Sequence, residues 1–146
     1  MIDISSKRRT ERRAVARCRL RMCEEAIRAL AAGTLPKGDA LAAARIAGIL
    51  GAKRTPDLIP LCHVIPLSSI SIDFRVAVER GEVEIEAVAH AHAPTGVEME
   101  ALTAAAIAAL TVYDMCKSID PGAEILQLCL VRKSGGESGL WQREER

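Results

Sequence analysis

The chain has 146 residues, of which 49% are hydrophobic and 2% aromatic, and its formal net charge at pH 7 is +1. This length suits one domain over residues 1–146, and the balance of charges excludes a global field that would draw the protein to nucleic acid or membranes. The chain also lacks the aromatic residues needed for stacking on single-stranded nucleic acid, because its aromatic residues are Phe74, Tyr113 and Trp141.

The cysteines form an odd set without a C-x-x-C pair: Cys18, Cys23, Cys62, Cys116 and Cys129. This spacing argues against a disulfide framework and a zinc site, and reduced thiols are typical of the cytoplasm. No signal peptide is predicted, because Asp3 and Lys7 interrupt any apolar stretch after Met1. We therefore expect a cytoplasmic protein.

Residues 10–32 are predicted to form a helix, because apolar residues recur there near helical spacing and Gly33 follows as a stop signal. The same region is locally basic, which indicates either a solvated face or a patch that attracts phosphates. The basic run consists of Lys7, Arg8, Arg9, Arg12, Arg13, Arg17, Arg19 and Arg21.

A turn at residues 35–39 precedes a second helix that Asp39 caps and that continues to about Leu50. An extended loop then begins at Thr55-Pro56. Alternating apolar residues over 70–78 and 83–89 flank an Arg-Gly turn, which is typical of a β-hairpin.

An alanine-rich helix is predicted over 97–118, followed by a strand over 124–132 and a tail, 134–146, of flexible composition. The alanine-rich run is too short and too weakly apolar to span a bilayer. Helices before and after an antiparallel hairpin predict an α+β fold with the helices on one face of the sheet. Small apolar residues on several helix faces suggest burial against another subunit.

Glu100 and Asp114 fall near one face of the alanine-rich helix but about 21 Å apart along its axis. Either one of them is catalytic alone, or a second copy of the chain brings its opposite helix end alongside. Lys117 follows Asp114 by three residues, so the two form either a surface ion pair or a proton-transfer pair. Glu98 and Glu100 are either helix-dipole partners or ligand contacts.

His63 ends an apolar run, where a lone histidine is commonly a satisfied core or loop group. With Lys53 ten residues upstream, an anion-binding or acid/base role competes with that interpretation. The neighbouring Cys62 is interpreted as a packed thiol. His90 and His92 share one side of a strand, but without a third ligand no metal site is predicted.

Several cations sit at loops or element ends and are either solvated or suited to a polyphosphate: Lys37, Lys53, Lys133 and Arg12. Neither a Walker loop nor G-x-G-x-x-G is present, so side chains would have to hold any nucleotide.

Three long motifs are Asp-Leu-Ile-Pro-Leu-Cys-His (57–63), Thr-Gly-Val-Glu-Met-Glu-Ala-Leu-Thr (95–103) and Tyr-Asp-Met-Cys-Lys (113–117). Together with shorter matches at residues 37–39, 44–48, 52–55 and 133–136, they resemble the cyclic pyranopterin monophosphate synthase family of molybdenum cofactor biosynthesis. The resemblance extends over about residues 3–139.

The resemblance implies a ferredoxin-like subunit that assembles as a homohexamer, a trimer of dimers with active sites between subunits. It implies conversion of 3′,8-cyclo-7,8-dihydroguanosine 5′-triphosphate to cyclic pyranopterin monophosphate with release of pyrophosphate, a lyase reaction. No cofactor or metal is implied, although Mg²⁺ could accompany the triphosphate.

The matched positions imply catalytic roles for Asp114, Lys117 and Lys53. The substrate-binding residues implied in the same way are Leu61, Cys62, His63, Glu98, Met99, Glu100, Lys37, Lys133 and Arg12.

This chain departs from the family pattern at four positions, which are Val64, His90, Pro94 and Glu137. Three of these replace a basic residue, so they are expected to affect affinity more than reaction type. They leave a second interpretation, a catalytically silent ferredoxin-like module that binds a nucleotide or pterin. RNA binding through the arginine-rich start of the chain is a weaker interpretation, because aromatic residues for base stacking are missing.

Overall fold

The computed structural model describes residues 1–144. Its elements are β1 (Thr10–Arg21), α1 (Glu24–Ala32), α2 (Ala40–Lys53), α3 (Thr55–Leu58), β2 (Ser69–Ala77), the short 3-10 helix η1 (Val78–Arg80), β3 (Glu82–Ala93), α4 (Glu98–Cys116), β4 (Glu124–Ser134) and β5 (Trp141–Gln142). The five strands form one antiparallel sheet in the order β2-β3-β1-β4-β5.

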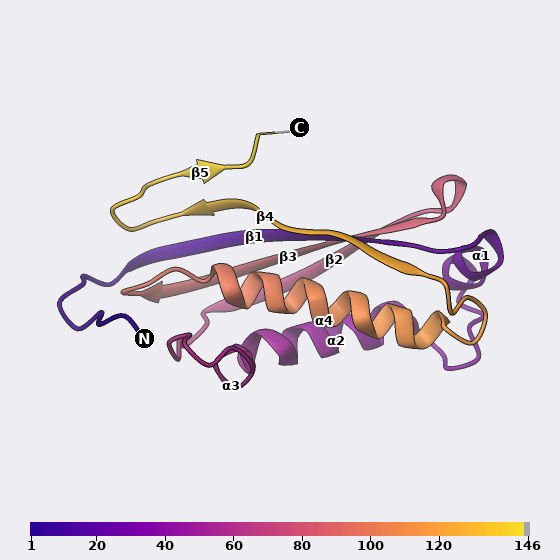
Figure 1. Cartoon of the computed structure of the whole chain (residues 1–146), viewed down its shortest axis with the longest axis horizontal. Helices are drawn as coiled ribbons and strands as arrows, with labels where there is room; N and C mark the ends of the chain where they lie inside the picture. The colour runs from indigo at the N-terminus through magenta and orange to yellow at the C-terminus, as the bar shows by residue number, and fades with distance from the viewer. Residues whose placement is uncertain (145–146) are drawn as a thin grey trace.

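The first four strands and the helices between them follow the βαββαβ order of ferredoxin-like folds. β1 and β3 lie in the middle of the sheet, and β5 extends the edge beyond β4. α2 and α4 pack together on one face of the sheet, with α4 over β1, β3 and β4 and α2 over β2 (Figure 1). The predicted α+β fold with helices on one face is therefore confirmed.

The helix predicted over residues 10–32 is wrong, because Thr10–Arg21 form the strand β1 and only the shorter helix α1 follows it. Buried Cys18 and Leu20 alternate with more exposed arginines such as Arg19. This period of two marks a strand with one face on the core. Alanine and arginine favour helices locally, but pairing with β3 and β4 on both sides overrides that preference.

Most other predicted elements are confirmed. Asp39 caps α2 through a hydrogen bond that its side chain accepts from the Ala42 amide. The predicted hairpin is β2 and β3, and Gly81 between them has the left-handed conformation, with φ of 62°. The sequence prediction missed α3, which starts where a loop was expected.

The predicted flexible tail, residues 134–146, includes an element that the sequence did not indicate. Trp141 and Gln142 form β5 and pair with the end of β4. Arg143 donates hydrogen bonds from its amide to the Val131 carbonyl and from Nε to the Leu130 carbonyl. Flexibility of the tail stays a prediction, and residues 145–146 lie outside the described part.

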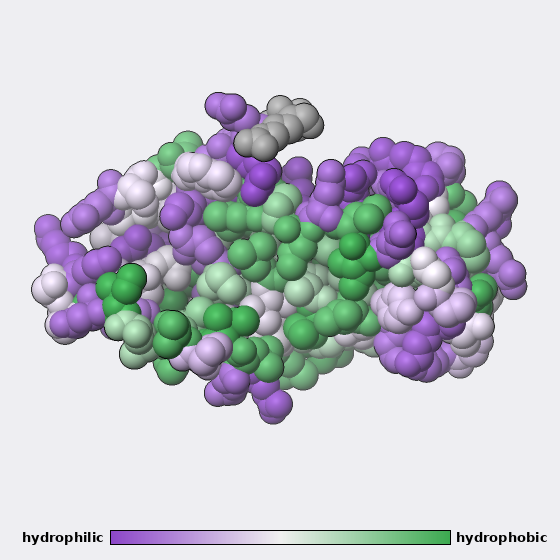
Figure 2. Space-filling model, in the orientation of Figure 1, coloured by the Kyte–Doolittle hydropathy of each residue, from purple (hydrophilic) through white to green (hydrophobic). Residues whose placement is uncertain are grey.

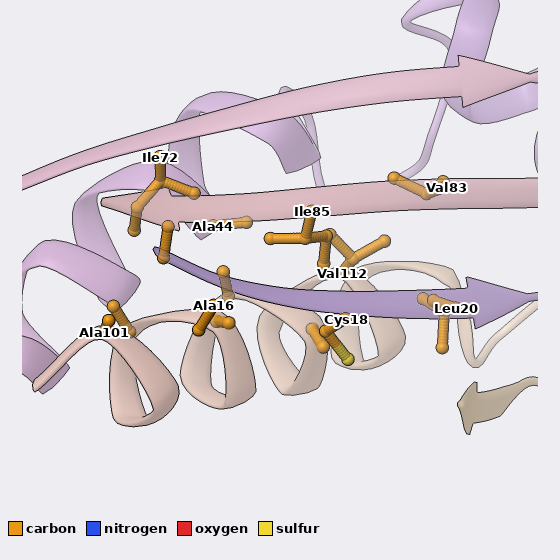
Figure 3. Close-up of a cluster of buried hydrophobic side chains, with 14 of the residues drawn as sticks. Ala16, Cys18, Leu20, Ala44, Ile72, Val83, Ile85, Ala101 and Val112 are labelled. Carbon is orange, nitrogen blue, oxygen red and sulfur yellow. The ribbon is translucent and has the colours of Figure 1, made fainter. Parts of the chain in front are cut away.

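The core is built from small residues because the two helices approach each other and the sheet closely. A Cβ atom at Gly48 of α2 would lie 2.8 Å from the Ala104 carbonyl oxygen of α4 and would collide with Ile72 of β2. Branched side chains such as Ile85 and Val112 fill the space between sheet and α4, as Figure 3 shows. This close packing fixes the position of α4. The two ends of α4 carry the acidic residues that were predicted for the site, Glu98 and Glu100 at one end and Asp114 at the other.

The face of the sheet away from the helices carries rows of opposite charges across neighbouring strands. Three arginines of the basic run on this face pair with glutamates of β3 rather than forming a free cationic patch. The pairs are Arg17–Glu86 at 2.7 Å, Arg19–Glu82 at 3.3 Å and Arg21–Glu82 at 2.8 Å. The prediction of a solvated face thus fits this part of the run.

By length and composition alone, α4 could cross a membrane. However, 50% of its most apolar 18-residue stretch is buried within the fold. Such burial is typical of a core helix. Apolar surface nevertheless gathers over the middle of this side of the molecule, between hydrophilic ends (Figure 2). Large exposed apolar residues of the helical layer are Ile46, Leu50 and Leu110.

Candidate active site

Two adjoining clefts lie at the end of the sheet where α4 begins. The larger, of about 890 Å³, lies between the start of β1, the residues before α4 and the end of β4. The smaller, of about 380 Å³, lies between the start of the chain, residues 61–65 and the first turn of α4. Both are lined by Lys7, Thr95, Gly96 and Glu98, so together they form one continuous depression.

The larger cleft is predominantly basic. Arg12 points into it from β1 and donates hydrogen bonds from Nε to the Ala93 carbonyl (3.2 Å) and from Nη2 to the Pro94 carbonyl (3.1 Å). Gly136, with φ of 70°, lies so close that a Cβ atom there would collide with the guanidinium of Arg12. The glycines after β4 therefore let the backbone close over Arg12.

Lys133, at the end of β4, pairs its Nζ with Glu98 Oε1 at 2.8 Å. This contact joins the basic cleft to the first turn of α4. Glu137, one of the departures from the family pattern, also lines the larger cleft and reduces its positive charge. The combination can hold an anion while keeping carboxylates within reach.

Glu100 is the most unusual side chain of the smaller cleft. It is 2% exposed, and its Oε2 has no hydrogen-bond partner among residues 1–144. Burial raises the pKa of Glu100 above its usual value, and the nearby charge of Glu98 adds to this shift. A buried acceptor without a partner is costly to the fold, so this oxygen is available for a donor group of a ligand.

The segment 61–63 forms the opposite wall of the smaller cleft, just after the turn that follows α3. Leu61 is 70% exposed, whereas Cys62 and His63 are partly buried. Burial raises the pKa of the Cys62 thiol, with a further contribution from the charge of Glu100. Cys62 is thus a protonated thiol at neutral pH, in agreement with the interpretation as a packed thiol rather than a nucleophile.

Asp114 lies near the opposite end of α4 and binds two lysines. Its Oδ1 is 2.7 Å from Lys117 Nζ, and its Oδ2 is 2.6 Å from Lys37 Nζ. Hydrogen bonds from Lys117 and then Lys37 lower the pKa of Asp114 to about 2, and the same contact raises the pKa of Lys117. Asp114 and Lys117 therefore both stay charged at neutral pH. Proton transfer by either of them requires another group to break their ion pair.

The structure thus divides the predicted site residues into two groups along α4. One end carries Glu98, Met99 and Glu100 with the 61–63 segment, Arg12 and Lys133. The other carries the Lys37–Asp114–Lys117 cluster. Lys53 is in the last turn of α2, and its side chain makes no hydrogen bond or ion pair within residues 1–144 and is exposed to solvent.

Several residues that line the clefts were not predicted from the sequence. Ile2 and Ile4 line the smaller cleft, and Thr10, whose Oγ1 is buried without a partner in the described chain, lines the larger. Lys7 and Arg13 were noted only as part of the basic run. Nothing local in the sequence signals Ile2 or Ile4, because their place depends on how the chain start folds back.

His90 and His92 lie on the same side of β3, as predicted, and this side is the face of the sheet away from the helices. His90 Nε2 accepts a hydrogen bond from Arg13 Nε at 3.2 Å, and Arg9 donates to the His92 carbonyl. Within residues 1–144, no three His, Cys, Asp or Glu residues cluster in a way that could hold a metal ion.

Replacing Glu100 by Gln should stabilise the protein in a pH-dependent manner. Because the pKa of Glu100 in the folded state is raised above 4.5, the unfolded chain releases this proton first, so stability is full below pH 4.5 and is lost as pH rises through the raised pKa of the folded state. Glu100→Gln should therefore gain on the order of 1–3 kcal/mol at pH 8, and this gain should shrink toward zero at pH 4. Thermal unfolding at both pH values measures it.

The exposed Glu79→Gln variant is the matched control and should show no growing difference with pH. A wild-type chain that is more stable than Glu100→Gln at pH 8 would contradict an uncompensated carboxylate at position 100.

The fold and the geometry of the clefts define the class of this protein. It is a ferredoxin-like α+β subunit with a cleft in which carboxylates lie next to cations. The chain belongs to the MoaC family, whose model matches residues 1–136.

Curated relatives are similar over nearly the whole chain. A cyclic pyranopterin monophosphate synthase from Roseiflexus sp. (strain RS-1) is 56% identical over 139 residues, covering 95% of this chain and 88% of the relative. Synthases of the same name from Chloroflexus aurantiacus (strain ATCC 29366 / DSM 635 / J-10-fl) and Geobacter metallireducens are 52% and 49% identical, covering 98% and 99% of this chain and 88% and 91% of those proteins.

Proposed function

We propose that this protein is a cyclic pyranopterin monophosphate synthase, an enzyme of an early step in molybdenum cofactor biosynthesis. It converts 3′,8-cyclo-7,8-dihydroguanosine 5′-triphosphate to cyclic pyranopterin monophosphate and pyrophosphate, which makes it a lyase. The observation that carries this proposal is the continuous depression with carboxylates at one end and cations at the other, in a chain of the MoaC family.

The two ends suit the two parts of such a substrate. Ring N–H groups of the guanine-derived end are donors, and Glu98 and Glu100 offer carboxylate acceptors, one of them without a partner among residues 1–144. The triphosphate is anionic, and Arg12 and Lys133 supply cations in the larger cleft. The substrate would lie with its ring in the smaller cleft and its phosphates in the larger.

Formation of the cyclic phosphate requires a substrate hydroxyl oxygen to attack the α-phosphorus. The bond from this phosphorus to the oxygen bridging to the β-phosphate breaks, pyrophosphate leaves, and the hydroxyl proton passes to a base. Cations near the leaving group stabilise its developing charge, a role that suits Arg12 and Lys133. Lys53 lines neither cleft of this copy, so we propose that it supplies its cation to the site of a neighbouring subunit.

Ring opening and closure require further proton transfers, for which Asp114 and Lys117 are the proposed residues. Asp114 lies about 21 Å from Glu100 along α4, and Lys117 lies farther along the same direction, so these groups are too far from Glu100 to act on the same substrate within one copy. We therefore include in the proposal a site shared between subunits of a homohexamer, a trimer of dimers. The apolar surface in Figure 2 is suited to burial in such an assembly.

The proposed enzyme works in the cytoplasm with a small nucleotide-derived substrate and without a resident cofactor or metal, nucleic acid or membrane. Mg²⁺ bound to the triphosphate is compatible with the proposal. The reduced state of five cysteines supports this compartment.

The direct test incubates the purified protein with the cyclic dihydro-GTP precursor and follows pyrophosphate and the pterin product together. Formation of both supports the proposal. The competing hypothesis is a catalytically silent module, which Val64 and the missing lysine at Pro94 would favour. Precursor binding without either product would decide for that module.

Replacing Lys53 by Ala should raise KM for the precursor about tenfold, with a smaller change in kcat. The exposed ammonium has no partner in residues 1–144 to hold it in place structurally, so its loss should act through the substrate phosphates. Lys53→Arg keeps the charge and should recover most of the affinity. Unchanged KM and kcat in Lys53→Ala would show that Lys53 is merely solvated.

A further inference from the structure

Residues 1–9 precede β1 and turn back toward the helical layer, so that the start of the chain lies near the beginning of α4 (Figure 1). We call residues 1–9 the strap. Two local hydrogen bonds form its bend: the Ser5 amide donates to Asp3 Oδ1 at 2.9 Å, and the Lys7 amide donates to the Ile4 carbonyl at 3.1 Å. The strap therefore has a defined turn although it contains no helix or strand.

The strap runs along both clefts. Ile2 and Ile4 line the smaller cleft, Ser6 and Arg8 line the larger, and Lys7 lines both. A molecule that filled the continuous depression would thus lie beside the strap along its whole length.

A hydrogen bond joins the strap to the opposite wall of the smaller cleft. His63 Nε2 lies 2.8 Å from the Ile2 carbonyl oxygen. A carbonyl oxygen only accepts, so Nε2 carries the hydrogen, and a neutral His63 presents the lone pair of Nδ1. The strap backbone thereby fixes both the orientation and the tautomer of His63.

The strap is held loosely. Ile2 is 76% and Met1 75% exposed, so little apolar surface of its first residues is buried. Ile2 and Ile4 face a cleft whose other apolar lining includes Leu61, Ile65 and Met99. A ring in that cleft would bury these side chains on both sides and exclude water from Glu100.

We propose that the strap is part of the substrate site: Ile2 and Ile4 close the mouth of the smaller cleft over the ring of the substrate, and the Ile2 carbonyl positions His63. Ile2 and Ile4 are binding residues, and the strap is a positioning element for His63. This inference rests on the proposed function, because the ligand is the cyclic dihydro-GTP precursor.

The experiment uses full-length protein carrying Asp114→Asn, in which turnover is expected to be about 10²–10⁴-fold slower, and measures equilibrium binding of the precursor. Adding Ile2→Ser and Ile4→Ser should weaken binding about tenfold, because apolar contacts with the ring are lost. The control is Leu140→Ser, which removes an aliphatic side chain that is 60% exposed and lines neither cleft. It should bind like the Asp114→Asn parent.

A second measurement detects closure directly. Trypsin cleaves after Lys7, Arg8 and Arg9, and mass spectrometry follows release of the strap peptides. Saturating precursor should slow these cleavages about tenfold in the Asp114→Asn parent, and the protection should be lost in the double serine variant.

Equal precursor affinity of parent and double serine variant, with unchanged trypsin cleavage, would overturn the strap proposal and leave the proposed function intact. Complete absence of precursor binding to the folded Asp114→Asn parent would overturn both. Slower trypsin cleavage of the parent with precursor bound, together with weaker precursor binding by the double serine variant, would establish the strap as part of the site.

Discussion

Replacing Asp114 by Asn should lower kcat by about 10²–10⁴-fold, the usual contribution of a group that transfers protons. Asn fills the same volume but cannot take up a proton, and without a negative charge it no longer holds the ammonium groups of Lys37 and Lys117. Steady-state kinetics with the cyclic dihydro-GTP precursor measures the effect. Turnover equal to that of the wild type would remove Asp114 from the mechanism.

The fold should survive this substitution, because both ion pairs of Asp114 are at the surface and such pairs contribute little. The lowered pKa of Asp114 means that its contribution to stability is present above about pH 3.8 and is lost as pH falls toward 2. Any difference in Tm from the wild type should shrink over that range. Asp73→Asn, which alters an exposed carboxylate on the other face of the sheet, is the activity control and should keep wild-type turnover.

Glu100→Gln removes the carboxylate that is proposed to accept ring N–H groups, so this variant should also lose activity. Mixing it with the Asp114→Asn chain should restore activity well above that of either variant alone. If each site takes Glu100 from one copy and Asp114 from the partner, half of randomly mixed dimers are mixed and each has one intact site. About a quarter of wild-type activity should therefore return after the chains are unfolded and refolded together.

The controls are each variant refolded alone and the two variants mixed after separate refolding. Mass spectrometry verifies that mixed oligomers form in the co-refolded sample. If activity does not recover in that sample, the result would contradict a site shared between subunits. It would favour the alternative in which only one end of α4 acts on the substrate.

The regular elements were predictable from the sequence wherever local pattern and tertiary environment agree. The alanine-rich residues of α4 favour a helix and are buried in one, and the alternating residues of β2 and β3 form a hairpin. β1 was misread because apolar residues over 10–32 recur near helical spacing, whereas the burial of Thr10–Arg21 alternates with a period of two. The partners that decide its state, β3 and β4, come more than 60 residues later in the chain.

The sequence indicated some of the residues that line the two clefts, such as Arg12, His63 and Glu98, but not how they are arranged. The contact between Lys37 and Asp114 joins positions 77 residues apart, and that between His63 and Ile2 spans 61. Such contacts follow from strand order and from the path of the chain start, which no local pattern encodes. The i, i+3 pair of Asp114 and Lys117 was predictable because the geometry of one helix fixes it.

The arginine–glutamate rows on the outer face of the sheet affect how quickly a charged molecule is captured. Positive and negative groups there alternate within a few ångströms, so their fields cancel at a distance and do not attract a polyanion. The excess cations beside the start of β1 and the end of β4 remain to guide a triphosphate by long-range attraction. Added salt should therefore slow the encounter with the substrate far more than it changes the lifetime of the complex.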